Sequence, residues 1–532
     1  EFSNYNNGLA TANSVKNTIV LTQVRPAVFN FTGPSGGLER DEELTDSVEV
    51  LSEDPLTIEY VVNADAVWSD GEPIDCDDFY FDWASSNGTY VELDENGEPV
   101  VDSETESEIQ LFPVASNSGS EDIESLDCSE DGKTITATFS SPYSDWRALF
   151  GGMLPGHVVE RESGVEDLVA AFEGDDAEAI AAMADFFVNG YTIDPGTILP
   201  DLMLSGSRLT IDSWEAGQSL TLVPNDAYWG TPANGPVTYR YIAEEAQAQA
   251  LANGEIDTMS PQPTVDLLAS LEGIDGVTVE SAPSFVFEHF DLNQANEALQ
   301  NRQVREAFAL CLPREQMVAN LIQPLVPDAQ PVNNRLVLDF EQGYEDTSGG
   351  LYDSVDLDRA QQLLDESGVA QPVELRLGWF DNGGNQRRTD QVALTLESCN
   401  QIGFNIIDAG SETFFDTELA AGDFDIAMFA WAGSPLKAGT IGQIYACEGG
   451  SNFINYCNPD VDELGRQVAA AATAEEQTAL SNEADALLWE DLATIPVFTF
   501  PGVAAWDSDV ANVVYNPSNN GLVWNAAEWA AS

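Results

Sequence analysis

Alternating apolar and polar positions predict several short strands in the first half of the chain. Leu56–Val62 and Thr134–Phe139 show this pattern, and a hairpin is predicted over 207–223 around a Gly-containing turn. β-branched residues at 18–24 predict another strand near the start. Acidic residues at 75–78 followed by apolar positions indicate a helix that continues to about Trp83.

In the second half, segments of helical periodicity alternate with short apolar runs. Because a strand, a helix and a second strand in this order form a crossover unit, parallel or mixed sheets are expected. The predicted fold class is therefore α/β. The expected helices are 304–310, 356–367, 390–401 and 475–492, and the expected strands are 373–377, 404–407, 425–431 and 495–500.

Composition excludes several classes of partner. The 532 residues contain 92 Asp plus Glu against 18 Lys plus Arg, which gives a formal net charge of −74. A surface this negative repels phosphate backbones and anionic headgroups, so we predict no nucleic-acid partner and no membrane binding through a basic patch. Hydrophobic residues make up 43% of the chain, enough for a large core, so a disordered chain is not expected.

Two features bear on the compartment. No apolar run of about 18 residues is present, so no transmembrane helix is predicted. The first residues are polar and carry no signal segment. The chain is therefore expected to be either cytosolic or a mature secreted protein whose leader has been removed.

The six cysteines favour the secreted alternative. Cys447 and Cys457 lie ten residues apart across a Gly-rich stretch, which predicts a local disulfide loop. An even number of cysteines predicts three bridges, although six cysteines allow about 15 pairings and six free thiols remain the alternative. Zinc is disfavoured because no C-x₂-C spacing occurs and the chain has two histidines. The cysteines expected to form bridges are Cys76, Cys128, Cys311, Cys399, Cys447 and Cys457.

No catalytic motif has the context that its chemistry needs. Residues 33–37 fit G-x-S-x-G, but no helix is expected straight after them, so they are interpreted as a Gly-rich connector. Residues 132–134 lack the first glycine of a phosphate-binding loop, and the acidic turn at 94–98 lacks the ligand order of a calcium loop. We predict no enzyme, no cofactor and no metal site. A hydrolase that uses carboxylates in a cleft is a much less favoured alternative to a non-enzymatic protein.

Six ordered motifs carry a resemblance to a known family. The chain contains W-x-D-G-x-P at 68–73 followed by Asp77-Asp78-Phe79, and it contains N-x-x-Y-W-G at 225–230. G-E-I-D follows at 254–257, then Asn293 with V-R-x-A at 304–307, D-x-D before Trp431, and N-F-x-x-Y at 452–456. This order resembles family 5 of the extracellular solute-binding proteins of ABC importers, which includes oligopeptide-, dipeptide- and nickel-binding proteins. Peptide-binding lipoproteins of the actinobacterial type are the nearest resemblance.

The resemblance implies a two-lobed fold of the periplasmic-binding-protein type, type II and cluster C, with an inserted third subdomain. Lobe I is expected to comprise residues 1–45, 191–264 and 493–532, the inserted subdomain residues 46–190, and lobe II residues 265–492. Such a protein captures its ligand in the cleft by hinge closure and delivers it to a membrane permease. It is expected to be a monomer at the cell surface, outside the cytoplasm, anchored by lipid through a removed N-terminal segment.

The implied ligand is an oligopeptide, because an extended peptide can add to a strand edge while its side chains enter roomy pockets. Peptide-binding members commonly place an Asp three residues after the tryptophan, to hold the peptide's α-ammonium group. Ser434 stands there in this chain, so a blocked or cyclic peptide, or a non-peptide solute such as a glycan or a metal chelate, remains open. The candidate ligand-binding residues are Arg25, Phe29, Asn293, Ala430, Trp431, Ala432, Gly433, Ser434, Phe498 and Phe500.

Overall fold

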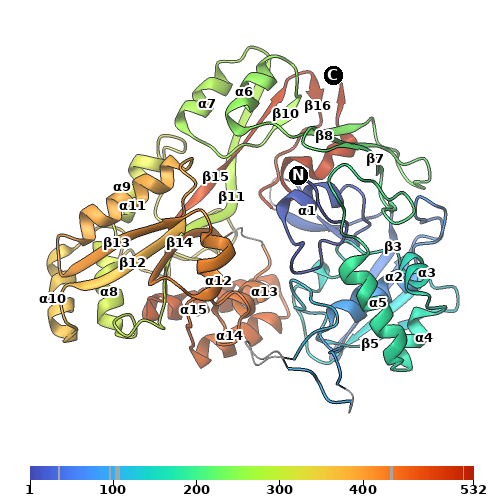
Figure 1. The fold of residues 1–532 in the computed structure, drawn as a ribbon, viewed down its shortest axis with the longest axis horizontal. Helices are drawn as coiled ribbons and strands as arrows, with labels where there is room; N and C mark the ends of the chain where they lie inside the picture. The colour runs from blue at the N-terminus through green and yellow to red at the C-terminus, as the bar shows by residue number, and fades with distance from the viewer. Residues whose placement is uncertain (34–35, 95–96, 102–107, 432–434, 519, 532) are drawn as a thin grey trace. The chain divides into compact units, whose positions relative to one another are not determined.

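The computed structural model (Figure 1) describes residues 1–33, 36–94, 97–101, 108–431, 435–518 and 520–531, apart from the side chains of Asp416 and Ala420. The chain forms two compact units. Unit 1 contains residues 1–261, 271–280 and 504–532, and unit 2 contains residues 262–270 and 281–503. Parts of the predicted Gly-rich connector (34–35) and of the acidic turn (95–96) lie outside the described residues. The division of residues 1–261 into a lobe and an inserted subdomain stays a prediction.

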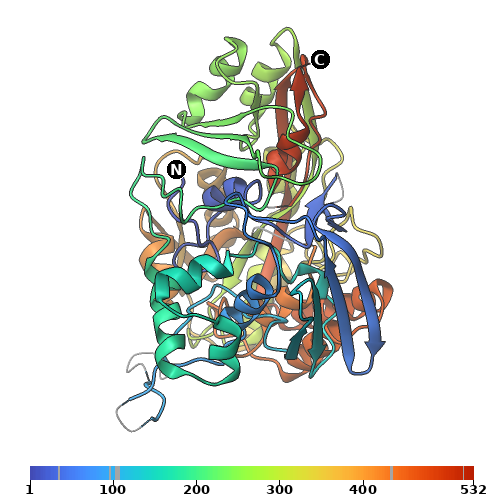
Figure 2. The same ribbon diagram turned by 90° about the vertical axis from the view of Figure 1, so that its right-hand side faces the viewer.

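Unit 1 contains a four-stranded antiparallel sheet with the order β3-β4-β6-β5. Strand β3 (Thr45–Glu53) and strand β4 (Leu56–Val62) form the long hairpin seen edge-on in Figure 2. Strand β6 (Thr134–Phe139) pairs with β4 and with β5 (Ile123–Cys128). Every second residue of β4 and β6 is buried, as the alternation predicts.

A second sheet of unit 1 has three antiparallel strands, β7 (Leu209–Glu215), β8 (Ser219–Pro224) and β9 (Val237–Arg240). The predicted hairpin over 207–223 corresponds to β7 and β8 and is confirmed. Strands β1 (Phe29–Thr32) and β2 (Gly37–Arg40) form a small sheet of their own. The helices of unit 1 that concern us are α2 (Cys76–Ser86), α3 (Gly156–Ser163), α4 (Leu168–Glu173) and α5 (Ala177–Asn189).

The predicted strand at 18–24 is wrong, because this segment begins with helix α1 (Val15–Leu21). The buried positions are Gln23 and a set of four, Asn17, Val20, Leu21 and Val24. Their spacing of three, four and seven residues is that of a helix face, and it outweighs the β-branched character of the segment.

The W-x-D-G motif has a structural role in unit 1. Trp68 is fully buried, and its Nε1 lies 3.2 Å from both carboxylate oxygens of Asp78. The same carboxylate accepts the backbone N–H groups of Asp75 at 3.0 Å and Gly156 at 2.8 Å. Asp78 therefore caps helix α2 and ties it to the first turn of α3.

The neighbouring Asp77 is expected to make stability depend on pH. Burial, together with the negative charges of Asp75 and Asp167, raises the pKa of Asp77 to about 6. A raised carboxyl pKa favours the folded state at low pH, and this contribution is lost as pH rises from about 4 to about 6. We expect Asp77→Asn to match the wild type near pH 3.5 and to be about 1 kcal/mol more stable at pH 7.5, after allowance for partial solvent screening.

Urea denaturation at the two pH values measures this difference. Asp65→Asn removes one charge from an exposed position of the same unit and serves as the control. An Asp77→Asn variant with the same advantage at both pH values would contradict the assignment.

The main sheet has the strand order β10-β15-β11-β14-β12-β13, and unit 2 contains most of it. In unit 2, β12 (Val373–Phe380) runs parallel to both β13 (Phe404–Ser411) and β14 (Ile426–Trp431). Strand β14 pairs in antiparallel fashion with the second half of β11 (Val277–Leu292). The mixed sheet expected from the alternating strands and helices is confirmed. The remaining strands of this sheet are β10 (Thr258–Met259) and β15 (Thr494–Asp507).

One face of this sheet carries the core of unit 2. Phe290, Leu377 and Met428 lie on neighbouring strands in this core and are fully buried. A disulfide joins Cys311 to Cys399 and so links two of the helices that cover this face. The helices that cover this face are α8 (Arg302–Cys311), α10 (Leu357–Ser367) and α11 (Gln386–Cys399), and the disulfide joins α8 to α11.

A segment with neither helix nor strand, residues 331–356, begins in the interior of unit 2, where residues 331–338 are buried. Arg335 anchors it: this fully buried side chain forms an ion pair of 2.9 Å with the equally buried Asp485 of helix α15 (Ala474–Asp491) and donates to the Thr494 carbonyl at 2.7 Å. Asn334 adds a hydrogen bond of 2.8 Å to Asn482 of the same helix. Polar side chains therefore fix the course of this segment.

No helix in the described part of the chain has the length and apolar character needed to cross a membrane.

Candidate ligand-binding face

The second face of the unit 2 sheet is aromatic. Strand β14 places Phe429 and Trp431 on it, opposite in direction to the core residue Met428. Strand β11 adds Phe287 and His289, because Phe287 is paired with Trp431 and His289 with Phe429 in the antiparallel register. We call these four side chains, together with Phe415 and Phe453, which contact them from neighbouring segments, the aromatic face.

The rings of the aromatic face are in direct contact. The Trp431 ring lies nearly parallel to His289, with centroids 5.7 Å apart at an angle of 9°, and to Phe453, with centroids 6.2 Å apart at 12°. Phe429 meets His289 edge-on at 4.3 Å and Trp431 at 5.0 Å. Offset-parallel and edge-to-face arrangements are the favourable ones for aromatic rings, so the stack holds Trp431 in a defined orientation.

A glycine in strand β12 makes room for the segment that borders the face. A Cβ atom at Gly378 would lie 2.6 Å from the ring of Phe414, which is too close for any other residue. Phe414 opens the π-helix η3 (Phe414–Glu418), and the next residue, Phe415, contacts Phe429 at 6.1 Å. Phe415 is 43% exposed, so this border of the face is open to solvent.

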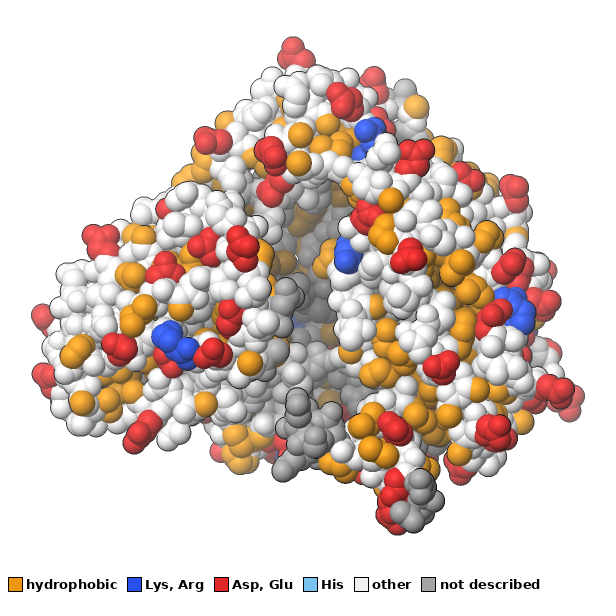
Figure 3. All heavy atoms as spheres, in the orientation of Figure 1, with side chains coloured by type: hydrophobic (Ala, Val, Ile, Leu, Met, Phe, Trp, Pro, Cys, Tyr) orange, Lys and Arg blue, Asp and Glu red, His pale blue; other side chains and the backbone are white. Residues whose placement is uncertain are grey.

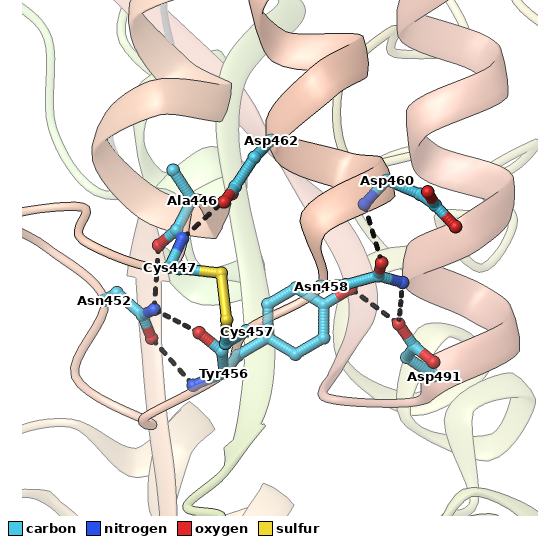
Figure 4. Close-up of a disulfide and its surroundings, with 9 residues drawn as sticks. All are labelled: Ala446, Cys447, Asn452, Tyr456, Cys457, Asn458, Asp460, Asp462 and Asp491. Carbon is cyan, nitrogen blue, oxygen red and sulfur yellow. Dashed lines mark hydrogen bonds between the residues drawn. A yellow bond between two sulfur atoms is a disulfide. The ribbon is translucent and has the colours of Figure 1, made fainter.

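The opposite border is a loop closed by the Cys447–Cys457 disulfide (Figure 4). Inside this loop, the Asn452 side chain donates to the carbonyls of Ala446 at 2.9 Å and Tyr456 at 2.6 Å, and it accepts from the Tyr456 N–H at 3.1 Å. Phe453 follows Asn452 directly. The disulfide and the Asn452 hydrogen bonds therefore position the ring that stacks on Trp431.

Residues of helix α14 (Pro459–Ala469) and helix α15 accept hydrogen bonds from this loop and from the residue that follows it (Figure 4). The Tyr456 hydroxyl and the Asn458 amide both donate to the Asp491 carboxylate at 2.7 Å. Burial and the hydrogen bond to Asp491 raise the pKa of Tyr456, so this phenol stays neutral at physiological pH. The Cys447 N–H donates to Asp462 at 3.0 Å.

The prediction of three disulfides is confirmed, with Cys447–Cys457 among them. The other two pairs are Cys76–Cys128 in unit 1 and Cys311–Cys399 in unit 2, and the described residues contain no free cysteine.

Asn293, a predicted ligand residue, has all its amide groups engaged inside unit 2. Its nitrogen donates to the carbonyls of Gly422 at 3.2 Å and Phe424 at 3.1 Å. Its oxygen accepts from the Ala295 N–H at 3.0 Å and from the Asn455 amide at 3.1 Å. Asn293 therefore links the end of β11 to the disulfide loop by hydrogen bonds, which is a structural role. Direct ligand contact of Asn293 stays a prediction.

The other predicted residues lie in several places. Ala430 pairs with Glu288 within the sheet, whereas Ala432, Gly433 and Ser434 lie outside the described residues. Phe498 is fully buried in the core of unit 2, and Phe500 packs beneath the guanidinium of Arg387, whose Cζ lies 4.2 Å from the ring centroid.

In unit 1, Phe29 meets Trp146 edge-on at 5.6 Å. Arg25 donates to the carbonyls of Met153 at 3.2 Å and Tyr5 at 3.4 Å, and burial lowers its pKa. Ligand contacts of Arg25, Phe29, Phe498 and Phe500 stay predictions. Within unit 2, the structure brings Trp431 together with side chains that the sequence did not single out, above all His289 and Phe453.

Acidic side chains do not gather around one site on the face of the molecule in view; they are spread over it (Figure 3). Near the aromatic face, Lys437 is almost fully buried and its Nζ forms an ion pair of 2.6 Å with Glu341. This cation is therefore already neutralised within unit 2.

The chain belongs to family 5 of the bacterial extracellular solute-binding proteins, whose middle region matches residues 41–453. The family prediction is confirmed, and the family is one of substrate-binding proteins. The predicted α/β, periplasmic-binding-protein-like fold class of type II is also confirmed.

Relatives extend over almost the whole chain. The oligopeptide-binding protein OppA of Mycobacterium tuberculosis is 27% identical over 516 residues, which cover 94% of this chain and 78% of that protein. An uncharacterized lipoprotein of Mycobacterium tuberculosis is 24% identical over 528 residues, which cover 94% of this chain and 86% of that protein.

Solved structures share the fold. The periplasmic EDTA-binding protein EppA superposes with a TM-score of 0.86 at 26% identity, covering 100% of this chain and 95% of that one. The oligopeptide-binding protein AppA from Bacillus subtilis, in complex with a nonapeptide, has a TM-score of 0.76 at 16% identity and covers 100% and 97% of the two chains.

Proposed function

We propose that this solute-binding protein captures oligopeptides and delivers them to the membrane permease of an ABC importer. The aromatic face carries this proposal, because it presents Trp431 and its neighbours where strand β14 ends. The full-length similarity to a protein named as oligopeptide-binding supports it. Capture by hinge closure of the two lobes is part of the proposal, on the ground of family membership.

The chemistry of the face suits a ligand whose side chains vary. Aromatic rings offer large contact areas and little directional demand, while the regularly spaced hydrogen bonds of a peptide can be met by main-chain groups at a strand end. A peptide with a blocked N-terminus is compatible with Ser434 at the position where peptide-binding relatives commonly have an Asp.

A metal chelate is the second candidate, and the likeness to the EDTA-binding protein EppA favours it. Such an anionic ligand needs cationic partners. Lys437, the cation described above near the aromatic face, is already paired with Glu341 at 2.6 Å. The oligopeptide is therefore the better supported ligand.

The ligand can be identified directly. Mass spectrometry of the material released when the purified protein is denatured is expected to show short peptides, and peptides incubated with the protein are expected to return uncut. A released chelate or glycan would contradict the oligopeptide proposal, and cleaved peptides would indicate a hydrolase.

Trp431 is expected to report binding. Adding the released peptides should change the tryptophan fluorescence of the wild type. Trp431→Phe should abolish most of this change and weaken binding about tenfold, because it removes the indole N–H and part of the stacking area. Trp214→Phe replaces a buried tryptophan of unit 1 and should leave signal and affinity unchanged. A full signal in the Trp431→Phe protein would show that the ligand binds elsewhere.

We also propose that the protein acts outside the cytoplasm and is anchored to the cell surface by lipid. The similarity to a mycobacterial protein named as a lipoprotein supports this location. Metabolic labelling with a palmitate analogue in the source cells tests the anchor, and recovery of the unlabelled protein from the cytosolic fraction would contradict it.

A further inference from the structure

His289 is an unusual residue to find in the interior of unit 2. Its side chain has no exposed surface and is surrounded by the rings of Phe287, Phe429 and Trp431. Neither ring nitrogen has a hydrogen-bond partner among the described residues. The nearest charged group is Asp291, whose Oδ2 lies 3.3 Å from Nε2, outside hydrogen-bonding geometry.

Trp431 presents a second polar group of the same kind. Its indole Nε1 is buried and has no hydrogen-bond partner among the described residues. The indole ring lies parallel to the His289 ring at 5.7 Å, so the polar edges of two adjacent rings are unpaired on one face of the sheet.

Packing alone does not account for this pair. Buried polar groups in native proteins are nearly always hydrogen-bonded, and the contact with Asp291 concerns Nε2, so it does not account for the unpaired Nδ1. Two neighbouring exceptions on the face proposed to bind the ligand therefore point to a partner that is not part of the chain.

The chemistry of the two groups defines that partner. The indole Nε1 can only donate a hydrogen bond. The carboxylate beside Nε2 favours the tautomer with its proton on Nε2, which leaves Nδ1 as an acceptor. One donor beside one acceptor is complementary to the C=O and N–H groups of a single residue in an extended peptide, because these two groups point to the same side of the chain.

We propose that His289 and Trp431 form a subsite for the main chain of one ligand residue. Trp431 Nε1 donates to the carbonyl of that residue, and His289 Nδ1 accepts from its N–H. The proposal rests on the proposed function and makes His289 a specificity-determining residue. Because His289 has no exposed surface, at least one of the side chains that surround it must move when the ligand enters.

The test compares a peptide with analogues that lack one N–H. The probes are penta-alanine, blocked at both ends, and versions in which one amide at a time is replaced by an ester. Calorimetry on the wild type should show one position where the ester weakens binding about tenfold or more. His289→Phe should weaken binding of the all-amide peptide by a similar factor and leave binding of that one ester unchanged.

Two variants separate this contact from a general structural effect. His289→Phe should fold cooperatively and melt close to the wild type, because the removal of an unpaired Nδ1 offsets the loss of the Nε2 group beside the buried Asp291 carboxylate. His289→Asn should retain more affinity than His289→Phe, since its carboxamide can accept the same hydrogen bond. His157→Gln, which alters a histidine of unit 1 paired with Asp70 at 3.0 Å, is the control and should bind like the wild type.

Nuclear magnetic resonance gives an independent readout, because the chain has two histidines. In the His157→Gln protein the imidazole ¹⁵N spectrum comes from His289 alone, and its Nδ1 signal should shift when penta-alanine is added.

Three outcomes would overturn part of the proposal. An unchanged Nδ1 signal with bound peptide, or equal losses for amide and ester in His289→Phe, would overturn the subsite but leave the proposed function intact. A wild type that binds neither penta-alanine nor a mixed peptide pool would overturn the proposed function itself.

Discussion

Replacing both Cys311 and Cys399 with alanine is expected to lower the free energy of unfolding by about 4 to 5 kcal/mol. This disulfide closes a loop with a sequence separation of 88, so its removal greatly increases the conformational freedom of the unfolded chain. It also joins helices α8 and α11, which cover the core face of the unit 2 sheet. Urea denaturation without reductant measures the loss.

The Cys447–Cys457 bridge provides the matched comparison, because its separation is 10. Alanine at both of its cysteines should cost about 2 to 3 kcal/mol, roughly 2 kcal/mol less than the longer bridge. The order should reverse for ligand affinity, since this short loop carries Phe453 onto Trp431. Equal stability losses, or an unchanged affinity in the variant of the short loop, would contradict these assignments.

The elements that sequence predicted well have signals in a few consecutive residues. Helix α10 is bounded by the capping carboxylate of Asp356 and by Gly368 in the left-handed conformation at φ 71°. Strand β14 ends at Trp431, as its apolar run indicates. Asn455, which bonds to Asn293, and Tyr456, which bonds to Asp491, lie in the N-F-x-x-Y motif at 452–456, so this motif holds the loop that carries Phe453.

Strand β11 was missed because its sequence carries conflicting signals. Strand β11 is continuous from 277 to 292 and contains Pro283, and a proline inside an apolar run normally argues against a strand. The buried residues on the side of β11 that faces away from the core cluster also change in kind along the strand. They begin with Phe285 and Phe287 and end with the polar His289 and Asp291. Only the antiparallel pairing with β14 shows that His289 and Trp431 share a face.

The buried arginines of unit 2 could not be predicted for a different reason. Arg314 and Arg335 are fully buried, and both guanidinium groups lie over the ring of Trp489, with Cζ atoms 5.1 Å and 4.2 Å from its centroid. A charged residue is normally read as exposed, both at the start of a short helix, as for Arg314, and in an irregular segment, as for Arg335. The partners that make burial possible, such as Asp485, lie about 150 residues away in the sequence.

Replacing Asp485 with asparagine is the second change expected to have a large effect, a loss of about 3 to 5 kcal/mol in the free energy of unfolding. Asp485 accepts from the Arg335 backbone N–H and from its guanidinium, both at 2.9 Å, and also from the Thr347 hydroxyl. With no exposed surface on either side chain, the guanidinium would be left as an uncompensated buried charge. Urea denaturation at neutral pH measures the loss.

Ligand affinity should fall together with stability. Arg335 fixes the segment that carries Val332, Leu338 and Phe340, which pack in the same cluster as Trp431. Glu463→Gln removes one partner of the exposed Arg466–Glu463 pair and should cost less than about 0.5 kcal/mol. The double change Arg335→Met with Asp485→Leu should recover most of the stability, because two apolar side chains leave no buried charge. If Asp485→Asn costs no more than Glu463→Gln, the buried pair does not hold this segment in place.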